Sequence, residues 1–97
     1  MSKPIIVWSI AAKKSLKAIY DYHKNKSPQG AKNVRTDLLN APKKIIFANQ
    51  YQEDEINPKY RRIIVRHYKV LYLGNDVKVE VIDIVSTRQS PEVLKGK

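Results

Sequence analysis

The sequence predicts an α+β fold, in which an N-terminal strand and a two-helix hairpin pack on an antiparallel sheet with a three-stranded meander. Two observations predict it. Strand-like and helix-like segments follow one another in the order strand, helix, helix, strand, strand, strand. The last three segments are separated by turn signals that are short enough for hairpins. The chain has 97 residues, so we expect residues 1–97 to form one domain with a single two-layer core.

The first two elements are a short strand and an amphipathic helix. Residues 5–8, "IIVW", form an apolar run after Pro4 that is typical of a strand. Ser9 then supplies a side-chain oxygen that can cap a helix. From residue 10 to about residue 24, apolar residues recur at steps of three and four, with lysines on the other face. His23 ends the apolar stripe, and we interpret it as a packing or end-capping residue.

A second helix follows a short break. Ser27 as N-cap and Pro28 at the first helical position predict its start, because the missing N–H of proline is not needed there. Pro42 cannot continue a regular helix, since it lacks a donor and clashes with the preceding turn. We therefore expect the helix to kink at Pro42, or to end and restart with Asn40 as cap through residues 45–47.

A polar loop then leads into the meander. The loop, residues 49–59, ends in Asn-Pro and contains a run of three acids, Glu53, Asp54 and Glu55. Three strands are expected at residues 61–65, 68–73 and 78–87. Arg66-His67 is short enough for a tight turn, and Gly74-Asn75 can adopt the positive φ that the next turn needs. The pattern leaves open where the first strand joins the sheet.

The period of two along a strand predicts which side chains share a face. A two-residue turn at Arg66-His67 pairs Val65 with Tyr68, Ile63 with Val70, and Arg61 with Tyr72. The opposite face is then expected to carry Arg62, Ile64, Lys69, Leu71 and Leu73. In the last strand, strict alternation separates Ile82, Ile84, Ser86 and Arg88 from Val79, Val81, Asp83 and Val85. An exposed face that mixes aliphatic and cationic groups is typical of a surface that a partner covers.

The composition narrows the function further. Nineteen Lys and Arg against nine Asp and Glu give a net charge of +10, which favours polyanionic partners such as RNA, DNA or an acidic protein. The chain has no cysteine, and His23 and His67 lack metal-ligand spacing, so we expect neither a metal nor a cofactor. No segment approaches the roughly 18 apolar residues of a membrane span. We therefore expect a cytoplasmic protein without a membrane partner.

Three segments together resemble the RelE/ParE superfamily of bacterial toxins, the toxin halves of type II toxin–antitoxin pairs. The segments are "WSIAAKKSLKAIYDY", "YRRIIVRHYKVLYL" and "VEVIDIVSTRQSP". The resemblance runs from Ile5 to Leu94 in order and in spacing, and "RRIIVRHYKVLY" and "TRQSPEVL" are closer to the ParE-like pattern. It implies the same fold, a growth-inhibiting activity, and a cognate antitoxin that neutralises it.

The superfamily implies two mechanisms. ParE-like members inhibit DNA gyrase, whereas RelE-like members are ribosome-dependent endonucleases that cut mRNA. The RelE pattern has a C-terminal tyrosine, but Leu94 stands near that position here. A nuclease would also need cations, which stabilise the charge that develops on phosphate, and an acid–base group. If the chain is a nuclease, the resemblance implies Arg62, Lys69 and Arg88 as the catalytic cations. In place of the missing tyrosine, His67 is then the candidate for the acid–base group.

Three functions therefore stay open, and the resemblance favours the first. They are a gyrase-directed toxin, an mRNA endonuclease that acts on the ribosome, and a non-toxic nucleic-acid-binding module. For contact with the target we expect the basic residues Arg61, Arg62, Arg66, Lys69 and Arg88. We expect the antitoxin to dock on the helical hairpin together with the sheet aliphatics Ile64, Leu71 and Ile82.

Overall fold

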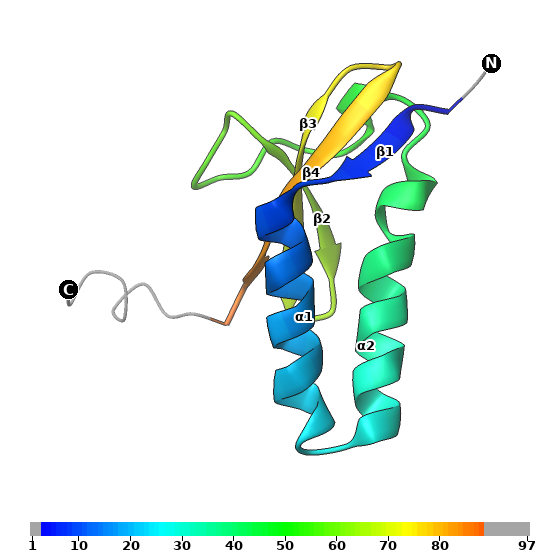
Figure 1. The fold of residues 1–97 in the computed structure, drawn as a ribbon. Helices are drawn as coiled ribbons and strands as arrows, with labels where there is room; N and C mark the ends of the chain where they lie inside the picture. The colour runs from blue at the N-terminus through cyan, green and yellow to red at the C-terminus, as the bar shows by residue number, and fades with distance from the viewer. Residues whose placement is uncertain (1–2, 89–97) are drawn as a thin grey trace.

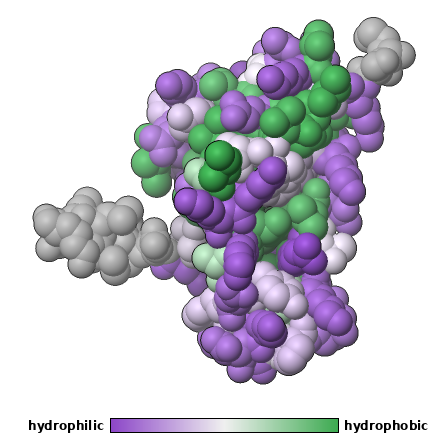
Figure 2. Space-filling model, in the orientation of Figure 1, coloured by the Kyte–Doolittle hydropathy of each residue, from purple (hydrophilic) through white to green (hydrophobic). Residues whose placement is uncertain are grey.

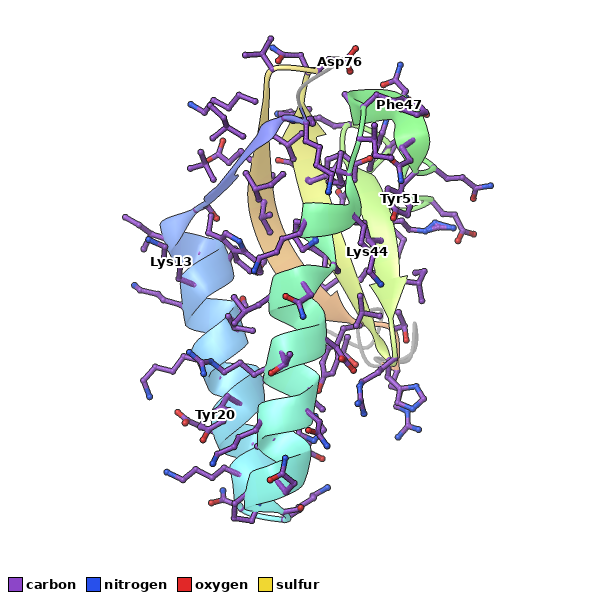
Figure 3. The ribbon with its side chains drawn as sticks, turned by 90° about the vertical axis from the view of Figure 1, so that its right-hand side faces the viewer. Lys13, Tyr20, Lys44, Phe47, Tyr51 and Asp76 are labelled. Carbon is purple, nitrogen blue, oxygen red and sulfur yellow. The ribbon has the colours of Figure 1, made fainter. Side chains whose placement is uncertain are left out.

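The computed structural model describes residues 3–88 and has two layers, with a helical hairpin on one face of a four-stranded sheet (Figure 1, Figure 3). Its main elements are β1 (Ile5–Trp8), α1 (Ile10–Lys24), α2 (Pro28–Asn40), β2 (Arg61–Val65), β3 (Tyr68–Gly74) and β4 (Lys78–Ser86). The predicted α+β fold is confirmed. Within the described residues, no helix has the length and apolar character that a membrane span requires.

Both helices begin where their capping residues predict. The Ser9 side chain accepts a hydrogen bond from the N–H of Ala12 at 3.0 Å, and the Ser27 side chain accepts one from Gly30 at 3.0 Å. Pro28 occupies the first turn of α2, where its missing N–H leaves no bond unmade. The buried stripe of the hairpin consists of Ala12, Leu16, Ala31, Val34 and Leu38. These small and aliphatic side chains let the two helices pack closely on the sheet.

The chain after α2 differs from the predicted kink or restart. The helix ends at Asn40, two 3₁₀ turns follow at Pro42–Lys44 and Ala48–Gln50, and residues 45–47 between them are not helical. The expected helical restart through residues 45–47 is therefore wrong. The Gln50 side chain explains the difference, because it accepts the Ile46 N–H at 2.6 Å and donates to the Lys44 carbonyl at 3.1 Å. These bonds satisfy backbone groups that a helix would otherwise pair.

The sheet has the strand order β1-β4-β3-β2. The meander β2-β3-β4 is antiparallel, and β2 pairs with β3 in the predicted register, with Val65 opposite Tyr68 and Ile63 opposite Val70. Strand β1 pairs with β4 in parallel, so the sheet is mixed rather than wholly antiparallel. This placement answers the question that the sequence pattern left open. It puts β1 at one edge of the sheet and β2 at the other.

A bulge in β4 corrects the predicted alternation of that strand. Leu71 pairs with Asp83 and the next residue, Tyr72, pairs with Val81, so Ile82 is an extra residue without a partner in the ladder. The alternation changes phase there. Val79, Val81 and Ile84 all belong to the core under the helices, although strict alternation had separated Ile84 from the other two. The Ser9 hydroxyl donates to the Ile82 carbonyl at 2.8 Å, which ties the start of α1 to the bulge.

The main core lies between the helices and the sheet. Its sheet side consists of Ile63, Val70, Tyr72, Val79, Val81 and Ile84. Leu71 is also buried, at 4% exposure, but it points to the other face, beside Arg62 on β2. Figure 2 shows apolar side chains around the sheet end of the molecule and a largely hydrophilic surface on the helical hairpin. The sheet face away from the helices is where the predicted site residues must be sought.

Candidate functional site

A run of three acids before β2 meets three cations of the sheet. We call Glu53, Asp54 and Glu55 the acidic strap. Each strap residue lies next to a different basic side chain of β2 or β3. The nitrogen–oxygen distances are 3.9 Å for Glu53–Arg61, 2.7 Å for Asp54–Lys69 and 3.8 Å for Glu55–Arg62. The backbone reinforces this arrangement, since the Arg62 N–H donates to the Gln52 carbonyl and the Asp54 N–H to the Tyr60 carbonyl.

The strongest of these contacts is the buried pair of Asp54 and Lys69. The Asp54 side chain is 1% exposed and the Lys69 side chain 13%. The second carboxylate oxygen of Asp54 accepts the backbone N–H groups of Asn57 at 2.9 Å and Ile56 at 3.2 Å. Burial by itself would raise the pKa of Asp54. The hydrogen bond and charge of Lys69, with the two backbone donors, outweigh burial and hold that pKa below its ordinary value.

Arg62 is held much more loosely than Lys69. Its side chain is 17% exposed, yet one nitrogen, Nη2, has only long contacts, 3.4 Å to the Gln52 side chain and 3.8 Å to Glu55. The other, Nη1, is buried and has no hydrogen-bond partner among residues 3–88. A buried donor without a partner is costly, so the Arg62 guanidinium is held less favourably than the Lys69 ammonium.

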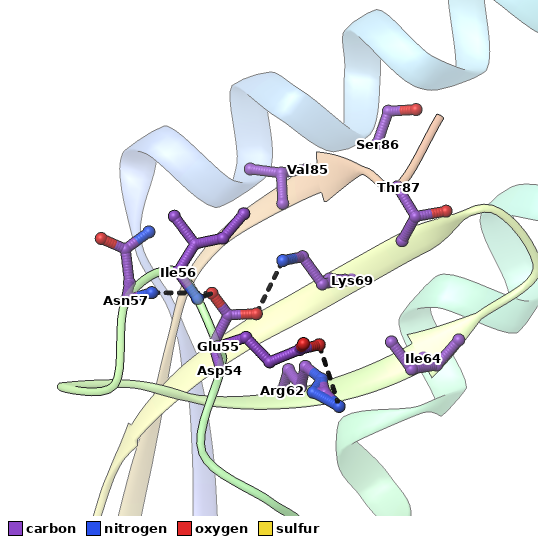
Figure 4. A pocket seen from close by; sticks show the side chains of 10 residues that line it. All are labelled: Asp54, Glu55, Ile56, Asn57, Arg62, Ile64, Lys69, Val85, Ser86 and Thr87. Carbon is purple, nitrogen blue, oxygen red and sulfur yellow. Dashed lines mark hydrogen bonds and ion pairs between the residues drawn. The ribbon is translucent and has the colours of Figure 1, made fainter. Parts of the chain in front are cut away.

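A cavity of about 390 Å³ lies between the strap and the sheet (Figure 4). Its walls are Asp54, Glu55, Ile56, Asn57, Arg62, Ile64, Lys69, Val85, Ser86 and Thr87. Figure 4 shows Lys69 reaching toward Asp54 and Glu55 lying alongside Arg62. The structure therefore brings together two of the predicted site cations, Arg62 and Lys69, with the predicted aliphatic Ile64.

The other predicted cations lie elsewhere. Arg61 points away from the cavity and donates to the Tyr51 carbonyl at 2.7 Å. Arg66, in the β2–β3 turn at φ 55°, pairs with Asp37 of α2 at 2.8 Å. The five predicted target-binding residues thus do not share one surface.

Arg88 and His67 form a separate contact at the end of the sheet. Arg88 Nη2 lies 2.8 Å from His67 Nε2, and both residues are exposed. The Thr87 N–H donates to the His67 carbonyl at 2.8 Å, which fixes the end of β4 against the β2–β3 turn. Thr87 is part of the cavity wall, and Arg88 is the next residue in the chain. Whether these residues contact a target stays a prediction.

His23 has a defined partner in the fold. Its Nε2 lies 2.8 Å from the Tyr68 hydroxyl, and the two rings meet edge to face with centroids 6.1 Å apart. Burial raises the pKa of Tyr68. The contact joins the end of α1 to the start of β3, which agrees with the packing role expected of His23.

The three aliphatic residues expected to bind the antitoxin differ in accessibility. Ile64 is 56% exposed at the cavity wall, whereas Leu71 is buried and Ile82 is half-buried in the bulge. Ile56, which the sequence did not single out, is 71% exposed at the same cavity. Sequence reasoning also missed Asp54, although its place in a run of three acids in a loop before three basic strand positions was a usable signal.

Comparisons with known proteins agree with this fold. A solved structure described as the chromosomal ParDE TA system from P. aeruginosa matches with a TM-score of 0.71 at 18% identity, covering 88% of this chain and 97% of that chain. A search of curated proteins finds no match. The sequence profile described as ParE toxin of type II toxin-antitoxin system, parDE, matches residues 6–91. The chain therefore belongs to the ParE toxin family of type II toxin–antitoxin systems.

Proposed function

We propose that this ParE-family protein inhibits bacterial growth by acting on DNA gyrase in the cytoplasm, and that its cognate antitoxin neutralises it. The family match over residues 6–91 supports the toxin assignment and implies the antitoxin. The net charge of +10 suits an encounter with an acidic protein surface or with an enzyme bound to DNA.

The observation that carries the choice of target is the Lys69–Asp54 pair. An mRNA endonuclease would need Lys69 to stabilise negative charge on a phosphate in the transition state. Here the ammonium group bonds a buried carboxylate at 2.7 Å, and an approaching phosphate would meet the charge of Asp54. The Lys69 charge is thus already compensated within the chain. This favours the gyrase-directed mechanism, and no described contact or family match favours the nuclease.

The antitoxin is expected to cover the exposed aliphatic and cationic residues of the open sheet face. Ile64 and Ile56 offer apolar area there, and Arg62 offers charge. A disordered acidic segment could fold onto such a surface, because the buried apolar area offsets its ordering cost.

Controlled expression in a bacterium tests the proposal. We expect growth arrest with filamentation and induction of the SOS response, because blocked gyrase damages DNA. Co-expression of the antitoxin should restore growth. Transcripts cut within codons, without SOS induction, would contradict the gyrase mechanism while leaving the family assignment in place.

A further inference from the structure

We propose that the helical hairpin binds the sugar–phosphate backbone of double-stranded DNA, through a groove between α1 and α2. The inference goes beyond the proposed function, because it concerns DNA itself and holds in the absence of gyrase. It depends on where the charge of the chain lies, on how few cations of the groove are held by acids, and on what the hairpin offers to a ligand.

Most of the net charge lies on the hairpin. Residues 10–44, the hairpin with the turn after it, contain nine Lys and Arg and two Asp, so they carry +7 of the total of +10. Residues 45–97 contain nine Lys and Arg but seven Asp and Glu, a net charge of +2. The sheet side is therefore close to balanced, and the positive field of the molecule comes mainly from the helices.

A groove between the two helices gathers four of these cations. It is a hollow of about 480 Å³ whose walls are Lys13, Leu16, Lys17, Tyr20, Asp21 and Lys24 of α1 and Arg35 of α2. Its four cations and one acid give the wall a net charge of +3, whereas the cavity beside the acidic strap has two charges of each sign. From Lys13 to Lys24 the helix rises about 16 Å, which is the rise of about five base pairs of DNA.

The lysines of the groove are held weakly or not at all by other groups. Among residues 3–88, the exposed side chains of Lys13 and Lys24 have no hydrogen-bond or ion-pair partner. Lys17 pairs with Asp21 at 2.9 Å, but the two side chains are 77% and 52% exposed, and such surface pairs are weak. On the sheet, in contrast, Lys69 bonds a buried carboxylate. The groove lysines can therefore meet phosphates without first losing a strong contact within the chain.

The surface chemistry of the hairpin favours DNA over an acidic protein. Interfaces between proteins have an apolar core and contain few lysines, whereas interfaces with DNA are much more positively charged. The large apolar side chains that the hairpin exposes are Ile10 and Tyr22, near the two ends of α1. Figure 2 shows that the hairpin surface between them is largely hydrophilic. A protein segment would find little apolar area to cover there.

The aromatic residue of the groove favours a duplex over a single strand. Proteins that bind single strands stack bases on aromatic rings. Tyr20 is half-buried, and the Arg35 guanidinium lies over its ring, 5.8 Å from the centroid. The ring therefore offers no open platform for a base, and the groove is left with contacts to the backbone.

Fluorescence anisotropy tests the proposal. Full-length protein is titrated into a labelled duplex of about 20 base pairs, without gyrase, at salt concentrations from about 50 to 200 mM. We expect a Kd below about 100 µM at the lowest salt. The logarithm of the affinity should fall with the logarithm of the salt concentration at a slope of about −2.7 or steeper, because three or more phosphates each contribute about −0.9.

Two double variants provide a matched comparison. Lys13→Gln/Lys24→Gln and Lys59→Gln/Lys78→Gln each replace two exposed lysines, but only the first pair lies in the groove. Glutamine is a good helix former, so the circular dichroism spectrum should be retained. We expect the groove variant to bind at least about tenfold more weakly, with a slope shallower by about 1.8. The other variant should lose less than about threefold in affinity and keep its slope.

Four results would overturn the proposal. A Kd above about 100 µM at the lowest salt would mean that the groove does not bind the duplex. Equal weakening by the two double variants would show that only the overall charge matters. Displacement of the duplex by poly-glutamate at an equal concentration of charges would assign the groove to an acidic protein. Equal or tighter binding of the single strand would assign it to unpaired nucleic acid.

Discussion

At the scale of single residues, what a cation of the sheet can bind depends on the groups that it already contacts as well as on its position in a strand. The sequence placed Arg62 and Lys69 on one face correctly, because β2 and β3 pair in the predicted register. It did not predict that Asp54, 15 residues before Lys69, would neutralise it. The alternation of side chains along a strand predicts which face of the sheet each one lies on. A loop, however, can bring any of its residues onto that face. The run of three acids before β2 signalled that an acid could meet these cations, but the strand pattern did not show that Asp54 would be the partner of Lys69.

Removing the buried carboxylate should destabilise the fold. For Asp54→Ala we expect the free energy of unfolding to fall by about 3 kcal/mol, because Lys69 is left with an uncompensated, largely buried charge. Urea unfolding at neutral pH measures this. The control is Asp21→Ala, which breaks the exposed Lys17–Asp21 pair and should cost much less. Equal losses for the two variants would contradict the importance of the buried pair.

The same pair should make stability depend on pH. The fold holds the pKa of Asp54 below its unfolded value of about 3.9. Ionised Asp54 therefore favours folding above that pH, and its contribution is lost as the pH falls through the lower, folded pKa. Urea midpoints measured from about pH 5 down to about pH 2 should fall more steeply for the wild type than for Asp54→Asn. Parallel curves would contradict the assignment.

At the scale of elements, the helices and the meander were predictable, whereas the bulge and the parallel strand were not. Helix starts follow from local caps such as Ser9, and the β2–β3 register from a two-residue turn. The bulge at Ile82 lies in a run of aliphatic residues, so a shift of phase leaves no trace in the hydrophobic pattern. The pairing of β1 with β4 joins segments some 70 residues apart, and local signals do not encode it.

The β3–β4 turn gives a prediction at this scale. Gly74 has φ +156°, and a Cβ atom there would lie 2.3 Å from the Lys78 carbonyl oxygen. Gly74→Ala should lower the free energy of unfolding by about 3 kcal/mol, because both the backbone and its neighbour would have to move. Thermal or urea unfolding measures the loss.

Gly30→Ala is the matched control for that substitution. Gly30 lies in α2, where alanine is favoured over glycine by about 1 kcal/mol, and its new Cβ would meet only the Ser27 side chain, at 3.2 Å. We expect stability within about 1 kcal/mol of the wild type. If Gly74→Ala were tolerated equally well, the turn would not require glycine.

At the scale of the whole molecule, net charge and local charge differ. The chain carries +10, but the five cations expected to meet the target all contact groups of the chain itself. Among them, Arg66 and Lys69 make close ion pairs with acids, at 2.8 Å and 2.7 Å. Composition predicted a basic protein correctly and gave no information on how its charges are compensated. The proposed action on gyrase does not require a set of free cations around a phosphate.

Supercoiling by purified DNA gyrase tests directly whether gyrase is the target of this protein. The purified protein is added to gyrase, ATP and relaxed plasmid, and in parallel to a translation extract with a reporter mRNA. If the protein acts on gyrase, supercoiling activity is lost at a protein concentration that leaves the mRNA intact, and the antitoxin restores supercoiling. Unaffected supercoiling, together with mRNA that is cut only when ribosomes are present, would contradict this action on gyrase.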